Sequence, residues 1–106
     1  MRIKAELLWG NSIQDQRKLY DLLHAGKLPS GYYVLLLTSE GKLEFIPSRM
    51  MKNRYFQTRD CVVFGLARDK KEATEMICDI LTQIYADHIY ESVAHYAGEV
   101  LGEPVC

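Results

Sequence analysis

Residues 32–38 (YYVLLLT) form an unbroken run of β-favouring side chains between turn-forming residues. Such a run predicts a buried strand in the middle of a sheet. Residues 39–42 (SEGK) follow, and Gly41 can take the positive φ that a tight hairpin turn requires. Residues 43–47 (LEFIP) then alternate as the returning strand. Pro47 cannot donate a ladder hydrogen bond, so it marks the end of that strand or an edge.

Two further strands are expected on either side of this hairpin in the sequence. Residues 61–67 (CVVFGLA) are a second apolar run and predict another buried strand. Gly65 within it is typical of a bulge or of a closely packed helix. Residues 2–9 (RIKAELLW) alternate between apolar and polar side chains until Leu8 breaks the pattern. This period predicts a half-buried strand, with a helix as the open alternative.

Residues 12–25 carry the start and stop signals of a helix. Ser12 is placed to cap it, with Asp15 at the capping-box spacing, and Gly26 is placed to end it. A second helix is predicted to begin at Asp69, which Glu72 follows at the same spacing. At about 100° per residue, the apolar side chains of this helix share one arc of roughly 140°. They are Ala73, Met76, Ile77, Ile80, Leu81 and Ile84.

The apolar stripe of this second helix changes direction near its end. If the helix continued, Val93, Tyr96, Ala97 and Val100 would lie roughly 170° from the first stripe. We therefore predict a break within residues 86–92, with Asp87 or Ser92 as a new cap and a short helix that ends near Leu101. The alternative is one continuous helix whose second stripe meets another surface, such as a partner chain. Residues 102–106 are expected to form a frayed tail.

The predicted order of elements is β-α-β-β-β-α-α, which places the chain in the α+β class. Because strands adjacent in sequence tend to pair, we expect an antiparallel meander of three to four strands. The helices are expected to pack on one face of it, in two layers. A chain of 106 residues has the ordinary size of one domain, so residues 1–106 are expected to form a single α+β domain.

Composition limits the classes of partner. The net charge is −1, whereas proteins that bind nucleic acid mainly through phosphates are usually basic. The cysteines Cys61, Cys78 and Cys106 match no zinc or redox spacing, and unpaired thiols suit a reducing compartment. No apolar run approaches the ~18 residues of a membrane span, and the first residues lack the apolar stretch of a signal peptide. We expect a cytoplasmic protein with no membrane partner.

Residues 49–59 (RMMKNRYFQTR) form the most unusual stretch, with four cations, two methionines, two aromatic rings and no anion. The candidates within it are Arg49, Met50, Met51, Lys52, Arg54, Tyr55, Phe56 and Arg59. These residue types are enriched at protein interfaces. They also suit a nucleic-acid surface, where cations meet phosphates and rings stack on unpaired bases. The third interpretation is a connecting loop whose apolar side chains hold it to the core.

The stripe of Val93, Tyr96 and Val100 is a second candidate interface. Nearby, His88, Glu91, His95 and Glu99 have the spacing of ligands on one helix face, but that arc is the expected solvent face. No metal or other cofactor is therefore expected. No local motif joins a serine or cysteine to a base, and the glycines form no phosphate-binding loop. No catalytic residue is assigned.

These observations favour a small interaction module, either a homodimer or a subunit of an assembly. A second apolar stripe needs cover, and residues 49–59 have the composition of an interface. A nucleic-acid accessory protein using residues 49–59 is the first alternative. The second is a ligand-binding domain or enzyme with a pocket between sheet and helices, in which tyrosines and His88 or His95 supply the polar groups.

Overall fold

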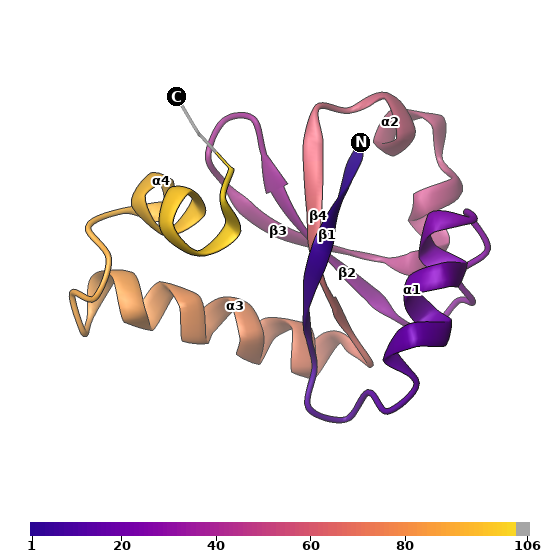
Figure 1. Cartoon of the computed structure of the whole chain (residues 1–106), viewed down its shortest axis with the longest axis horizontal. Helices are drawn as coiled ribbons and strands as arrows, with labels where there is room; N and C mark the ends of the chain where they lie inside the picture. Colours follow the sequence, from indigo (N-terminus) through magenta and orange to yellow (C-terminus); the bar gives the residue numbers. More distant parts are fainter. Residues whose placement is uncertain (104–106) are drawn as a thin grey trace.

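Four strands form a mixed sheet at the centre of the protein, for which a computed structural model describes residues 1–103. The strands are β1 (Arg2–Trp9), β2 (Tyr33–Thr38), β3 (Leu43–Pro47) and β4 (Cys61–Ala67), in the spatial order β1-β4-β2-β3 (Figure 1). β1 runs parallel to β4, whereas β2 is antiparallel to both of its neighbours. The described residues also form four α-helices, so the α+β class is confirmed.

The central strands β2 and β4 come from the two apolar runs that the sequence singled out. Every residue of β4 is buried, as is β2 from Val34 to Thr38. The hairpin of β2 and β3 is confirmed, and Gly41 in its turn has a φ of 82°. Glycine takes this conformation without strain because it has no Cβ.

The predicted antiparallel meander is wrong in its strand order. β4 lies on the far side of β2 from β3, between β2 and β1. Burial gives the physical reason, because β4 is apolar along its whole length and belongs in the interior of the sheet. β3 alternates and ends at Pro47, which suits an edge. Residues 48–60 carry the chain back across β2 to reach β4.

One face of the sheet is covered by α1 (Gln16–His24), by the short α2 (Arg54–Thr58) and by the 3-10 turn η1 (Ser48–Lys52). Apolar side chains form the core between these elements and the strands. Its buried members are Ile13, Leu19, Leu23, Leu28, Val34, Leu36, Ile46, Cys61, Val63 and Leu66.

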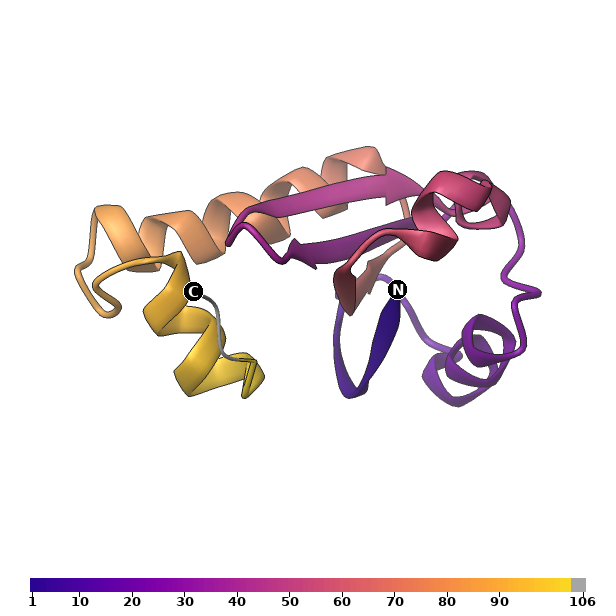
Figure 2. The same ribbon diagram turned by 90° about the horizontal axis from the view of Figure 1, so that it is seen from above.

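The opposite face is covered by α3 (Lys70–Tyr85), by α4 (Val93–Tyr96) and by the π-helical turn η2 (Ala97–Leu101). Figure 2 shows α3 and α1 on opposite sides of the strands, so the prediction of helices on one face only is wrong. Because β2 and β4 are apolar on both sides, each face needs its own cover. The buried members of this second core are Leu35, Leu37, Phe64, Ala67, Ala73, Ile80, Ile84, Tyr96, Ala97 and Leu101.

The helix caps agree with the sequence at two of three positions. The Asp69 side chain accepts a hydrogen bond from the backbone N–H of Glu72, and Ser92 caps α4 by accepting one from His95. The break before α4 is therefore confirmed, with Ser92 as its cap. The first helix begins at Gln16, four residues later than Ser12, because the Ser12 hydroxyl is bonded to Glu72 of α3 instead.

β1 is an irregular edge strand. It pairs with β4 near its start, at Ile3, and again at its end from Leu8, with a register shift over residues 4–7. A Cβ at Gly65 would lie 3.0 Å from the Leu8 carbonyl oxygen, so this glycine permits the close approach of the two strands. Alternation along the strand points Leu8 toward the α3-side core and Trp9 toward the α1-side core. This is why Leu8 breaks the alternation in the sequence.

The last described residues are held to the body of the protein. Gly102 ends η2 in the left-handed conformation, and the Glu103 N–H donates to the Ala97 carbonyl at 2.9 Å. The Glu103 carboxylate lies 3.3 Å from Arg2. The frayed tail predicted for residues 102–106 stays a prediction for residues 104–106, which lie outside the described residues.

Candidate functional site

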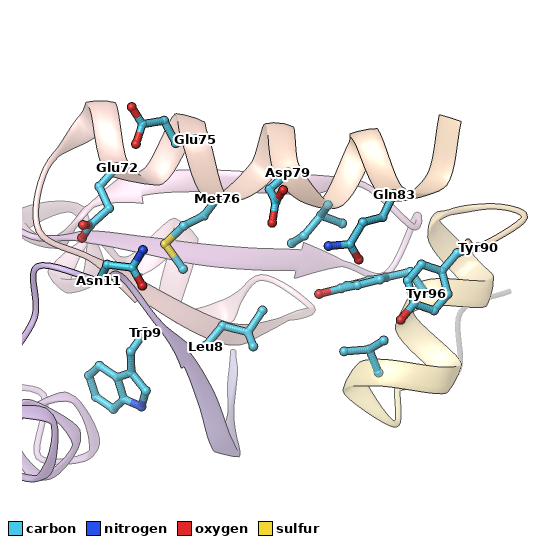
Figure 3. Close-up of a pocket in the computed structure, with 12 residues that line it drawn as sticks. Leu8, Trp9, Asn11, Glu72, Glu75, Met76, Asp79, Gln83, Tyr90 and Tyr96 are labelled. Atoms are coloured by element: carbon cyan, nitrogen blue, oxygen red, sulfur yellow. The ribbon is translucent and has the colours of Figure 1, made fainter. Parts of the chain in front are cut away.

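A cleft of about 590 Å³ lies between α3, the end of β1 and the α4 region (Figure 3). Its volume is within the range of sites that hold small ligands or a side chain of a partner. Its walls come from three segments far apart in the chain. The lining residues are Leu8, Trp9, Asn11, Glu72, Glu75, Met76, Asp79, Ile80, Gln83, Tyr90, Tyr96 and Val100.

The polar lining of the cleft is acidic. Glu72, Glu75 and Asp79 stand at successive turns of α3, and among the described residues no lysine, arginine or histidine lines the cleft. In Figure 3, Asp79 points from α3 into the cleft, whereas Glu75 points away from its floor. Three carboxylates beside low-dielectric walls produce a negative potential that attracts cations. The remaining polar side chain that α3 contributes to the lining is the amide of Gln83.

The floor of the cleft is apolar. Leu8 of β1 and Met76 of α3 lie partly buried against the second core, and Ile80 is buried within it. Val100 of η2 closes the side and is 39% exposed. A ligand that combines a positive charge with an apolar stem therefore finds complementary surface here.

Two tyrosines form the end wall beside α4. The rings of Tyr90 and Tyr96 are 5.1 Å apart and nearly perpendicular, at 88°. Tyr96 is only 3% exposed, and its hydroxyl makes no hydrogen bond with any residue in the described range 1–103. Burial, followed by the proximity of Tyr90 and of the Asp79 carboxylate, raises the pKa of Tyr96 to about 12. The Tyr96 phenol is therefore neutral at physiological pH and can still accept or donate a hydrogen bond.

Glu72 occupies the other end of the cleft, where it serves the structure. Its carboxylate accepts hydrogen bonds from the Arg68 N–H at 2.9 Å and from the Ser12 hydroxyl at 2.8 Å. It also accepts the Ser12 N–H at 3.1 Å. This carboxylate therefore ties the loop after β1 to the start of α3, and it leaves Asp79 as the acidic group free to meet a ligand.

The Glu72 network is expected to make stability depend on acid pH. Burial alone would raise the pKa of Glu72, but the hydrogen bonds from Arg68 and Ser12 outweigh it and lower the pKa below 4.5. The stabilisation is therefore complete above the unfolded-state value and is lost as the pH falls through the folded-state pKa. In urea titrations, the stability gap between the parent and Glu72→Gln should narrow below about pH 4.5. A gap that stays constant down to pH 3 would contradict this.

Residues 49–59 divide into a partly buried set and an exposed set. Met50, Met51 and Phe56 pack against the α1-side core, so they hold η1 and α2 in place. This agrees with the interpretation of these three as anchors of a connecting segment. Sequence composition alone did not separate them from the exposed residues, because methionine and phenylalanine suit a core as well as an interface.

The cations of this segment differ in their surroundings. Arg59 lies 2.7 Å from the Glu44 carboxylate, and its guanidinium lies over the Tyr55 ring at 5.8 Å. Arg49, Lys52 and Arg54 are exposed and form no ion pair with any residue in the described part of the chain. The Tyr55 side chain is 62% exposed.

The second candidate interface is covered by the chain itself. Tyr96 is buried in the α3-side core and Val93 packs against it, because the break before α4 turns the second apolar stripe back onto the sheet. Only Val100 keeps substantial exposure. The stripe therefore needs no partner chain to cover it, which removes one reason for expecting a dimer.

A second, shallower cleft of about 530 Å³ lies between β1 and α1. It is lined by Ala5, Glu6, Leu7, Trp9, Gln16, Arg17, Tyr20 and Asp21. Its charged groups are of both signs, and Arg17 pairs with Asp21 at 3.8 Å. Its two carboxylates, Glu6 and Asp21, are offset in part by Arg17, so its negative charge is smaller than that of the first cleft.

Among residues 1–103, the remaining candidate residues are not brought together into a metal site or a catalytic site. His88 lies in the break with a φ of 54°, so the helical spacing of the histidines and glutamates does not apply to it. The His95 Nδ1 accepts the Glu91 N–H at 3.0 Å. Within residues 1–103, no three His, Cys, Asp or Glu side chains come together as metal ligands. Burial raises the pKa of the Cys61 thiol, which disfavours a nucleophilic thiolate.

The fold and the cleft define a small α+β protein with an acidic cleft at a sheet edge. Comparisons with models of protein families, with curated proteins and with solved structures gave no match. None of the helices described in residues 1–103 combines the length and apolarity needed to cross a membrane.

Proposed function

We propose that the protein is a small protein–protein interaction module whose cleft receives a lysine or arginine side chain of a partner. The observation that carries this proposal is the position of Asp79 beside the buried Tyr96, above an apolar floor and with no cation in the lining. A cleft built this way favours the binding of a positively charged group. The acidic cleft thus supports an interaction module more directly than residues 49–59 do.

Each part of a basic side chain has a counterpart in the cleft. The aliphatic stem of lysine or arginine packs on Leu8, Met76 and Val100. The cationic head lies against Asp79, and it donates hydrogen bonds to the tyrosine hydroxyls or packs on the faces of their rings. A carboxylate ligand of the same length would find only repulsion.

The charge preference can be measured with small probes. In amide NMR titrations, butylguanidinium is expected to shift the resonances of cleft residues such as Gln83 and Tyr90, whereas pentanoate is not. Asp79→Asn should weaken butylguanidinium binding by about fivefold, because a partly exposed charge pair contributes about 1 kcal/mol. Asp60→Asn, which removes the same charge outside the cleft, should leave binding unchanged.

Two results with the parent protein would contradict the proposal. One is equal binding of the cation and the anion, which would show that charge does not select the ligand. The other is a cation that shifts no cleft resonance at the highest concentration reached. Equal loss in Asp79→Asn and Asp60→Asn would point to a general effect of net charge instead of a site.

A further inference from the structure

We propose that the partner is a second copy of this chain, whose exposed cations enter the acidic cleft. This inference rests on the proposed function, because it names the occupant of the same cleft. The occupant is the basic segment, defined here as residues 49–59 on η1 and α2. Two molecules would then join head to tail through unlike surfaces.

The basic segment offers what the cleft lacks. Arg49, Lys52 and Arg54 are exposed without an ion pair among the described residues, and Tyr55 stands beside them at 62% exposure. Met50, Met51 and Phe56 fix the backbone of this segment to the core, so its cations stand on a rigid support. Less conformational entropy is lost when a fixed segment binds than when a free loop does.

The cleft cannot be filled by the basic segment of its own chain. η1 and α2 pack on the face of the sheet that α1 also covers, whereas α3 and α4 pack on the other face (Figure 1). The cleft lies on the side of α3 and α4. The sheet therefore lies between donor and acceptor within one molecule. With the two surfaces on different sides, contact between copies is heterologous and leaves one free surface of each kind at the ends.

The separation of charge gives the association its character. The net charge is only −1, so copies repel one another weakly, while the cleft and the basic segment attract locally. Contacts between partly exposed charges are screened by salt. We therefore expect a weak association that grows with protein concentration and disappears at high salt. The homo-oligomer that the sequence predicted thus stays a proposal. It now forms through the acidic cleft and the basic segment instead of the apolar stripe, and it joins unlike surfaces.

Light scattering on a size-exclusion column, at rising concentration and low salt, tests this inference. The average mass of the parent protein should rise above that of one chain and return to it in high salt. Asp79→Lys reverses the charge of a side chain in the cleft, and Arg54→Glu does so in the basic segment. Each variant alone should therefore associate roughly tenfold more weakly or not at all. Glu40→Lys and Lys18→Glu make the same charge changes at exposed positions elsewhere and should behave as the parent does.

Mixing the two variants gives the decisive result. Asp79→Lys keeps an intact basic segment and Arg54→Glu keeps an intact cleft, so an equimolar mixture should recover the association that each variant alone has lost. If Asp79→Lys fails to fold, Asp79→Asn combined with Glu75→Gln takes its place in the mixture.

The outcomes separate this inference from the proposed function. A parent that stays monomeric at low salt, while butylguanidinium still shifts cleft resonances, overturns the inference and leaves the cation site standing. Loss of both responses overturns both. Nucleic acid that co-purifies with a monomer and is lost in Arg54→Glu also overturns the inference, because the basic segment would then serve a nucleic-acid partner.

Discussion

Replacing Tyr96 by alanine is expected to lower the free energy of unfolding by about 3 kcal/mol. The ring is 3% exposed and packs among the buried side chains of the α3-side core, where it meets Tyr90 edge to face. Removing it leaves a cavity between α4 and the sheet, which costs contacts as well as transfer free energy. Urea unfolding followed by far-ultraviolet circular dichroism measures the change.

Tyr96→Phe is the matched control, because it keeps the ring and removes only the hydroxyl. That hydroxyl has no hydrogen-bond partner among the described residues, so stability should change by less than about 1 kcal/mol. The same variant should nevertheless bind butylguanidinium more weakly, because it removes the phenol oxygen of a residue that lines the cleft. If Tyr96→Ala lowered the free energy of unfolding by only the roughly 0.5 kcal/mol typical of surface substitutions, Tyr96 would be an exposed residue. That result would contradict the fold of α4.

The α4 region shows how much of the fold could be predicted from the sequence. The reversal of the apolar stripe correctly predicted the break, and Ser92 is one of the two caps that the sequence allowed. It did not reveal where the second stripe would turn, because periodicity gives the faces of a helix but not the surface that each face meets. The structure turns that stripe onto the chain's own sheet, and Tyr96 becomes core.

The strands show the same limit. Each strand was visible as a run or an alternation, but local pairing preference placed β4 beside β3. The choice between edge and centre is made by burial on both faces, and β4 is buried along its whole length while β3 is not. A purely apolar run flanked by alternating ones could have been assigned to the interior of the sheet on that ground.

The acidic cleft was missed in the sequence, although part of it was legible there. Glu72, Glu75, Asp79 and Gln83 have spacings of three, four and four, which places them on one side of α3 beside its apolar arc. The opposite wall depends on the irregular course of β1 and on the turn that positions Tyr90. Neither of these follows from residue patterns, so a charged stripe resembled an ordinary solvent face.

Replacing Glu72 by alanine is expected to lower the free energy of unfolding by about 2 kcal/mol, the second largest effect. Three donors lose their acceptor, namely the N–H groups of Arg68 and Ser12 and the Ser12 hydroxyl. These donors are partly reached by water, which keeps the loss below that of three buried bonds. Thermal and urea unfolding should agree on this difference at neutral pH, where the carboxylate is ionised.

Gly10 provides an independent check on the position of the Glu72 carboxylate. A Cβ at residue 10 would overlap that carboxylate, so Gly10→Ala must push it away from Ser12 and Arg68. In the parent, Gly10→Ala should therefore cost about 1 to 2 kcal/mol, similar to losing the network itself. In the Glu72→Ala background the obstruction is gone, so the same substitution should be almost neutral and can even stabilise by restricting the unfolded chain. The double-mutant cycle should thus give a coupling of about 1 kcal/mol or more, whereas additive effects would mean that Glu72 does not sit over Gly10.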